Sequence, residues 1–460
     1  MLFNSLQFLF GFLPVVYFVF WRLRSRQARY VWLTISGYVF YSFWDYRFCA
    51  LMALSTGVSY LAGRGMLAHP HRKRLYMWTA VVTDLALLGF FKYAGFAMRS
   101  TSDLAALFGW NLAVPAWNLV LPVGISFYTF HTITYIVDAY RGVIVPTRNF
   151  FEFSTYVSLF AQLVAGPIVR FRQIEADLDD LDAAEQRRDL DRAWSFLTIG
   201  LAKKVLIADG LAAAIDPMWD RADSLSTTDA WLATLGYTYQ LYFDFSGYSD
   251  MAVGLALMFG LRLPQNFNSP YKAVDIADFW RRWHISLSTI LRDYLYIPLG
   301  GSRRGSLMTY RNLMITMLLG GLWHGAAWTF VIWGGYHGAL LCLHRLTAHH
   351  TAIVPVAARQ LTTFALVVLG WVWFRAATVE DALTMYGKLL RPSIGEPIAG
   401  QFALILLLAV AAVVAHGLPN TWNLRHAWGP VTNLGLVTLM LMVMVMLYSG
   451  DTSPFLYFQF

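Results

Sequence analysis

The chain has 460 residues, of which 57% are hydrophobic and only 13% are charged, against roughly a quarter charged in ordinary soluble domains. So many apolar side chains exclude a disordered chain, a coiled coil and a water-soluble globule, and they leave a multi-span membrane protein as the fold class. The formal net charge of +8 is what basic cytoplasmic loops produce, so it gives no reason to expect a nucleic-acid partner.

The N-terminal region predicts three membrane-embedded helices with a defined orientation. The apolar run Leu2–Trp21 is followed by four arginines between residues 22 and 29, and no basic residue precedes it. We therefore expect a first span rather than a cleaved signal peptide, with the N-terminus outside the cytoplasm and the arginines inside it. Two further apolar runs, at 30–44 and 49–63, bring the chain back to the cytoplasm at the basic cluster 71–74.

The remainder of the chain predicts an all-α polytopic membrane protein. At about 20 residues per crossing, we expect roughly ten to twelve tilted transmembrane or re-entrant helices within one domain, residues 1–460. The sequence shows no internal repeat, which argues against an inverted-repeat transporter. The further apolar stretches lie near 75–98, 115–138, 151–169, 194–215, 229–260, 312–343, 360–376, 402–416 and 431–449.

One segment, residues 170–192, differs because it is densely charged. Leu178, Leu181 and the pair Ala183–Ala184 give it only a thin apolar stripe. This pattern predicts an amphipathic surface helix or linker beside the bilayer, with solvated rather than catalytic carboxylates.

The longest uncharged stretch surrounds His324. Between Arg311 and Arg345 lie 33 residues without Asp, Glu, Lys or Arg. A straight helix of that length would measure about 50 Å, against an apolar membrane core of about 30 Å. The stretch must therefore tilt strongly, break or turn back, and its glycines, with two pairs at GxxxG spacing, provide break points and close helix packing.

His324 is the first candidate catalytic residue. It lies deep in this apolar stretch beside Trp323, where desolvation disfavours the imidazolium ion, and neutral imidazole is a competent general base. A histidine that only hydrogen-bonds a neighbouring helix fits the same context equally well. His337 follows 13 residues later, on a different face of an unbroken helix, and we expect a structural role for it.

His284 lies in a second polar stretch, among basic and aromatic residues, and is either a second site histidine or an interfacial residue. Asp278 and Arg282 are spaced as an i, i+4 ion pair. Arg281, Arg282 and Arg292 suit the cytoplasmic headgroup region, where they could hold the phosphates of a coenzyme A donor or contact lipid headgroups.

A third polar stretch carries Asp244 and Asp250 in otherwise apolar sequence, with the hydroxyl of Tyr248 between them. We expect a hydrogen-bond network that locks helices together; the alternative is a polar tunnel in which Asp244 and Tyr248 bind substrate or donor. No nucleophile-elbow pattern surrounds the serines here, and Cys49 and Cys342 fit no metal-ligand spacing. We therefore expect neither covalent serine catalysis nor a metal site.

Taken together, these stretches resemble the membrane-bound O-acyltransferase family, and within it the bacterial alginate O-acetyltransferase branch. By this resemblance His324 matches the family's essential membrane histidine, and His284 matches its second characteristic polar position. The resemblance covers nearly the whole chain and is carried by Met1–Ser5, Leu121–Phe130, Tyr135–Gly142, Gln162–Ile168, Tyr242–Ala252, Pro264–Pro270, Phe279–Ser288, Gly321–Gly325 and Phe455–Phe460.

The resemblance implies a ring of tilted helices around a central tunnel that opens to both faces of a bacterial inner membrane, with membrane lipid around it. The donor would be a cytoplasmic acyl thioester, with acetyl-CoA as the default, and no cofactor would be bound. The acceptor would be a hydroxyl of an extracytoplasmic polysaccharide, or a periplasmic acyltransferase partner that relays the acyl group. A glycan or lipid transporter and a scaffold subunit of a polysaccharide export complex remain as alternatives, and the sequence does not identify the glycan.

Overall fold

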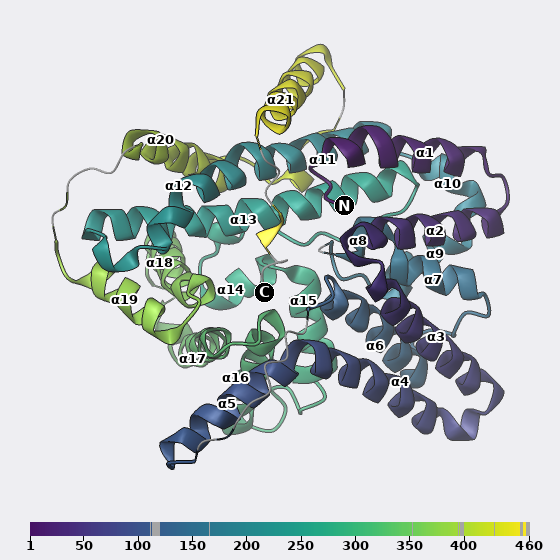
Figure 1. Ribbon diagram of the computed structural model, residues 1–460, viewed down its shortest axis with the longest axis horizontal. Helices are drawn as coiled ribbons and strands as arrows, with labels where there is room; N and C mark the ends of the chain where they lie inside the picture. The colour runs from purple at the N-terminus through teal and green to yellow at the C-terminus, as the bar shows by residue number, and fades with distance from the viewer. Residues whose placement is uncertain are drawn as a thin grey trace. The chain divides into compact units, whose positions relative to one another are not determined.

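The computed structural model describes residues 1–460 except 111, 113–119, 165, 352, 394, 396–399, 427, 451–453 and 457–460. Secondary structure in the described residues is helical, without a β-strand, as the composition predicts. The chain forms two compact units (Figure 1): Met1–Leu190 with Leu255–Pro264, and Asp191–Gly254 with Gln265–Phe460.

The first unit begins with the three apolar runs predicted at its N-terminus, and each of them forms a helix. A π-helical turn, Gln7–Phe12, precedes the first of these helices. The hydroxyl of Ser25 accepts a hydrogen bond from the backbone N–H of Ala28 (3.2 Å) and so caps the second. The helices of this unit are α1 (Leu13–Arg22), α2 (Arg26–Asp45), α3 (Arg47–Ala68), α4 (Lys73–Leu88), α5 (Ala94–Leu107), α6 (Ile125–Arg141), α7 (Phe150–Ser158), α8 (Phe160–Leu163), α9 (Phe171–Asp179) and α10 (Ala184–Arg187).

A buried carboxylate joins α3, α4 and α6, which lie side by side in the first unit (Figure 1). Asp84 of α4 is 1% exposed. It accepts hydrogen bonds from Ser55 (2.6 Å) and Ser59 (3.3 Å) of α3 and from Thr132 (2.7 Å) of α6. One side chain therefore ties three helices together at a depth where an unpaired polar group would be costly. The sequence analysis did not single out this residue.

The charged segment 170–192 is not one helix. It folds as α9, a 3₁₀ turn at Leu181–Ala183 and α10. Ile174, Asp177, Leu178 and Leu181 have helical spacing and are all buried, so Asp177 shares the apolar face rather than the solvated one. It pairs there with Arg262, whose Nε lies 3.1 Å from each carboxylate oxygen.

The second unit contains α11 to α21 and is built around the long helix α13. Glycines let α11 approach α13 closely, because a Cβ on Gly247 would lie 2.7 Å from the carbonyl oxygen of Gly200. The helices are α11 (Leu190–Ala202), α12 (Asp209–Trp219), α13 (Thr227–Met258), α14 (Ile276–Arg282), α15 (Ile285–Ile290), α16 (Ser306–His324), α17 (Trp328–Thr351), α18 (Val356–Arg375), α19 (Val379–Leu390), α20 (Gln401–Ala412) and α21 (Pro430–Ser449).

Three helical segments among the described residues are long and apolar enough to cross a membrane: Pro70–Leu107, Val356–Arg375 and Pro430–Ser449. The shorter apolar helices Gln7–Arg22 and Gln401–Gly417 join them. The remaining helices are shorter or carry more polar residues, so length and composition alone do not define how many of them are embedded. The count of ten to twelve and the ring around a tunnel stay predictions.

The cluster around Asp84 yields a stability prediction. We expect Asp84→Ala to lower the free energy of unfolding by about 2–4 kcal/mol, because three buried hydroxyls lose their acceptor. Asp84→Asn keeps one carbonyl acceptor and should lose less. The measurement is thermal unfolding of the purified protein in detergent, with Asp103→Ala on exposed α5 as the control. Equal midpoints for Asp84→Ala and Asp103→Ala would contradict the proposed role.

Candidate active site

His324 is the last residue of α16, directly before a break in the backbone. Gly325 is extended (φ −157°, ψ 149°), and α17 begins at Trp328. The uncharged stretch thus turns back on itself as a helical hairpin, which confirms that it is not one straight helix. α16 and α17 lie side by side (Figure 1).

Glycines bring the two helices of this hairpin into backbone contact. A Cβ on Gly321 would overlap the carbonyl oxygen of Phe330, and a Cβ on Gly334 would overlap that of Met317. The predicted use of these glycines for close packing is therefore confirmed. The tight hairpin places His324 at a fixed turn, with its imidazole directed by a rigid pair of helices.

His284 also lies where one helix ends and another begins. It separates α14 from α15 and has a left-handed backbone (φ 44°, ψ 55°), which non-glycine residues rarely adopt. Its Nδ1 accepts a hydrogen bond from the backbone N–H of Leu287 (3.2 Å) and caps α15. Because Nδ1 is an acceptor, the proton of the neutral ring is on Nε2.

Asn266 holds the turn at His284 from outside. Its backbone carbonyl accepts from the N–H of Ile285 (2.9 Å), and its Oδ1 accepts from the hydroxyl of Ser286 (2.9 Å). Its amide nitrogen donates to Ser249 of α13 (3.2 Å). The strained backbone at His284 is thus fixed by bonds on both sides, as is typical of functional sites.

The structure brings the two predicted catalytic histidines together. Their ring centroids are 6.4 Å apart, with the planes at 77°. His284 is 0% and His324 3% exposed. Trp323 contacts both rings, at 6.1 Å from His284 and 5.0 Å from His324.

Aromatic side chains enclose the two imidazoles. Trp333 and Phe374 lie 5.1 and 5.2 Å from His324, and Phe245 lies 4.7 Å from His284. These rings leave almost no exposed surface on either imidazole.

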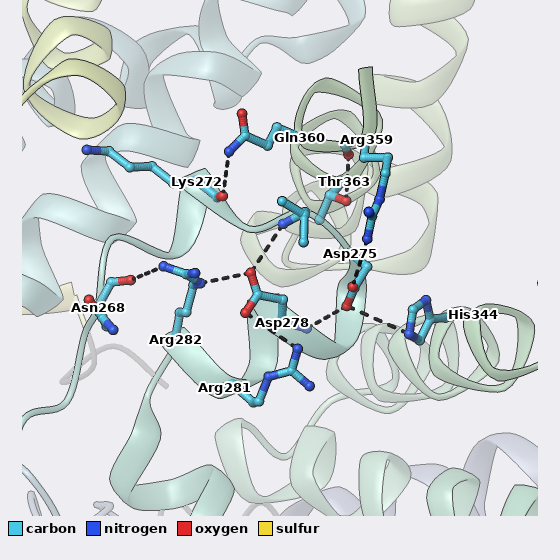
Figure 2. Close-up of polar contacts among 11 residues, drawn as sticks. Asn268, Lys272, Asp275, Asp278, Arg281, Arg282, His344, Arg359, Gln360 and Thr363 are labelled. Atoms are coloured by element: carbon cyan, nitrogen blue, oxygen red, sulfur yellow. Dashed lines mark hydrogen bonds and ion pairs between the residues drawn. The ribbon is translucent and has the colours of Figure 1, made fainter. Parts of the chain in front are cut away.

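Nearby carboxylates pair with the predicted donor-binding arginines, and Figure 2 shows Arg281 and Arg282 beside Asp278. Arg282 forms the expected i, i+4 pair with Asp278 (2.9 Å), and Arg281 lies 3.5 Å from the same carboxylate. Arg292 pairs with Asp293 (2.7 Å). The side chains of Arg281 and Arg292 are 67% and 59% exposed, so they remain accessible to a charged ligand.

Asp275, which the sequence analysis missed, anchors α14 (Figure 2). Its carboxylate accepts from the N–H of Asp278 (2.7 Å) and caps the helix. It also lies 3.5 Å from Arg359 of α18 and 3.7 Å from His344 of α17. The signal in the sequence was an Asp directly before a short helix, but its partners lie too far along the chain to be inferred.

The structure places Asp244 and Asp250 of α13 in ion pairs. Asp244 pairs with Lys204 (2.6 Å) and accepts from the backbone N–H of Leu456 (2.8 Å). Asp250 pairs with Lys203 (2.6 Å). These contacts favour the helix-locking network over binding of substrate by Asp244.

Tyr248, the other predicted binding residue of this stretch, is buried, and its ring packs 4.7 Å from Phe455. The same Phe455 ring lies 5.5 Å from Phe245, which contacts His284. Tyr248 therefore belongs to the aromatic packing behind His284. Its role in binding substrate stays a prediction.

The chain is similar to known proteins along most of its length. The model of the MBOAT, membrane-bound O-acyltransferase family matches residues 35–382. The chain is 40% identical to "Probable alginate O-acetylase AlgI" of Pseudomonas putida over 100% of both chains. It is 46% identical to the Pseudomonas aeruginosa protein of the same name, over 84% of this chain and 74% of that one. It is 38% identical to "Peptidoglycan O-acetyltransferase" of Helicobacter pylori, over 86% of this chain and 80% of that one.

The turn at His284 yields a prediction about folding. Asparagine tolerates the left-handed conformation and caps helices, whereas valine does neither. We expect His284→Asn to keep the unfolding midpoint within a few degrees of wild type. We expect His284→Val to lower the free energy of unfolding by about 2 kcal/mol or more. Thermal unfolding in detergent measures both, and the idea fails if the two variants are equally stable.

Proposed function

Because the chain belongs to the membrane-bound O-acyltransferase family, we propose that it transfers an acetyl group from cytoplasmic acetyl-CoA to a hydroxyl outside the cytoplasm. The family makes the chain an acyltransferase in a membrane. The observation that carries the finer proposal is the meeting of His284 and His324, 6.4 Å apart between ring centroids, inside an aromatic enclosure.

The acceptor is proposed to be an extracytoplasmic polysaccharide. Relatives at 40–46% identity are named for alginate and one at 38% for peptidoglycan. Since one alginate relative matches along the whole length of both chains, alginate or a similar exopolysaccharide is the first acceptor to test. The acetyl group either reaches the polysaccharide directly or passes through a hydroxyl of a periplasmic acyltransferase partner.

His324 is proposed as the general base. It takes the proton of the acceptor hydroxyl as that oxygen attacks the thioester carbonyl carbon, so that a C–O bond forms. The C–S bond then breaks, and the coenzyme A thiolate takes the proton back from the imidazolium. The products are the acetyl ester and free coenzyme A, with His324 returned to its neutral form.

His284 is proposed as a hydrogen-bond donor in the same step. Its Nδ1 is used by the Leu287 N–H, so its neutral ring presents an N–H at Nε2. That N–H stabilises the negative charge that develops on the thioester carbonyl oxygen. The two histidines therefore have different tasks, which the hydrogen bond at Nδ1 assigns.

Three arginines provide a proposed site for the negatively charged part of the donor. The exposed Arg281 and Arg292, with Arg282, are proposed to hold the phosphates of acetyl-CoA at the cytoplasmic face of the inner membrane. The acetyl group, still bonded to the pantetheine sulfur, extends inward to the histidines while the nucleotide stays at the face, because a charged nucleotide does not enter an apolar membrane region. The N-terminus is proposed to lie in the periplasm, as the arginines after the first span predict.

The base is tested by His324→Gln and His324→Ala. We expect both to fold and to lose acetyl transfer by about 100-fold to 10,000-fold, the typical contribution of a general base. The assay follows labelled acetate from acetyl-CoA to alginate oligosaccharide with purified protein, with and without a periplasmic acyltransferase. The matched control is His416→Gln, which changes a histidine of the same unit that contacts neither His284 nor His324 within the ring contacts described.

Three outcomes separate the candidate functions. Wild-type transfer by His324→Gln would overturn the base assignment. Movement of unmodified glycan across vesicles without consumption of acetyl-CoA would indicate a transporter. Acetyl transfer by the periplasmic acyltransferase alone, unaffected by this chain, would indicate a scaffold.

The donor site is tested by Arg281→Ala combined with Arg292→Ala. We expect KM for acetyl-CoA to rise roughly tenfold to a hundredfold with kcat unchanged, because each of the two charge-assisted phosphate contacts is worth about one factor of ten. KM for S-acetylpantetheine, which lacks the phosphates, should not change. Arg391→Ala, an exposed arginine of the same unit, is the control. Equal effects on both donors would contradict a phosphate-binding role.

A further inference from the structure

His337 of α17 is buried in a way that the proposed reaction does not explain. Its side chain is 0% exposed, and both ring nitrogens lack a hydrogen-bond partner among the described residues. A buried polar group without a partner destabilises the folded state relative to an apolar side chain of the same shape. If this histidine only filled space, leucine or phenylalanine in its place would make the folded state more stable.

Aromatic rings form the surroundings of this imidazole. They come from α14, α17 and α18, and their centroids lie 4.9 to 6.3 Å from that of His337. These rings surround the imidazole, and neither ring nitrogen has a hydrogen-bond partner among the described residues. The neighbours are Phe279, Trp280, Trp333, Tyr336 and Trp371.

The neighbouring helix leaves room for this side chain. Gly370 of α18 faces the ring, and a Cβ there would lie 3.0 Å from Nε2 of His337 and 3.1 Å from the ring of Tyr336. A larger residue would push the imidazole out of place. His337 thus supplies an imidazole that makes no conventional hydrogen bond with the described residues, and Gly370 leaves the space that this ring occupies.

Trp333 connects His337 to the reaction centre. Its ring lies 4.9 Å from His337 and 5.1 Å from His324, where it meets the imidazole edge-on at 89°. Phe374 packs against both Trp333 (5.1 Å) and His324 (5.2 Å). Because the helix breaks after His324, residues that an unbroken helix would separate meet at one indole ring.

We infer that His337 is a positioning residue for acyl transfer: it fixes the orientation of Trp333, and Trp333 fixes the imidazole of His324. This inference rests on the proposed role of His324 as the base. His337 does not touch the reacting atoms. Its effect is on the alignment of His324 with the acceptor hydroxyl, and small misalignments lower kcat strongly.

The experiment compares His337→Phe with wild type. We expect the unfolding midpoint to stay equal or to rise, because two unpaired nitrogens are removed. We expect kcat for acetyl transfer to fall at least tenfold and KM for acetyl-CoA to stay unchanged. A residue with a merely structural role would give the opposite, a lower midpoint with an unchanged kcat for the folded protein. His416→Phe, another histidine packed on aromatic rings, 4.9 Å from Phe364, should keep kcat within twofold.

A double-mutant cycle tests the route through Trp333. Trp333→Phe should lower kcat with KM unchanged, and adding His337→Phe should lower it no further, because both changes release the same ring. A double variant whose loss is the product of the two single losses would overturn the route. If His337→Phe does not fold, His337→Leu takes its place with the same readouts.

The outcomes also separate this inference from the proposed function. Wild-type transfer by His324→Gln overturns the role of His324 as base. An inactive His324→Gln together with wild-type kcat in His337→Phe overturns the positioning role alone.

Discussion

The backbone break after His324 is the constraint on which the site depends. A straight helix through the 33 uncharged residues would keep His324 apart from Trp333. The glycine contacts between α16 and α17 instead hold the stretch as a hairpin. The turn at His284 is a second break, held in a left-handed conformation by Asn266 and by its own capping bond. Both imidazoles therefore lie at helix ends, where the fixed backbone sets the direction in which each side chain leaves the chain.

Charge is arranged around this site in a consistent way. The carboxylates of the second unit that were followed above are paired with cations: Asp244 with Lys204, Asp250 with Lys203, Asp275 with Arg359 and Asp278 with Arg282. The first three pairs link segments that lie far apart in the sequence, whereas the Asp278–Arg282 pair lies within α14. The rings found around His284 and His324 are aromatic. In such low-polarity surroundings a single hydrogen bond to a developing charge is stronger than in water, so two neutral imidazoles are enough for the proposed chemistry.

The features of the fold and the site that could be predicted from the sequence are those whose residues lie close together along the chain. The helical class, the first three helices, the break in the uncharged stretch and the Asp278–Arg282 pair follow from local pattern, and the two histidines follow from family resemblance. The partners of Asp177 and Asp244 could not be inferred, because Arg262 and Lys204 lie 85 and 40 positions away. In the segment 170–192 the expectation of solvated carboxylates does not hold for Asp177, for a related reason: this residue falls on the apolar face by its spacing, and a distant arginine pairs with it there.

His337 shows the limit of an argument from helical periodicity. On a continuous helix it faces away from His324, which led to the expectation of a structural role. The break changes the geometry, since α17 runs back along α16 and Trp333 then contacts both histidines. In the part of the chain that the structure describes, neither nitrogen of this imidazole has a hydrogen-bond partner, and a Cβ on Gly370 would lie 3.0 Å from its Nε2. Polar groups that lower stability persist where function requires them. Stability and activity are therefore expected to move in opposite directions at this position, which is the property that distinguishes a positioning residue from a packing one.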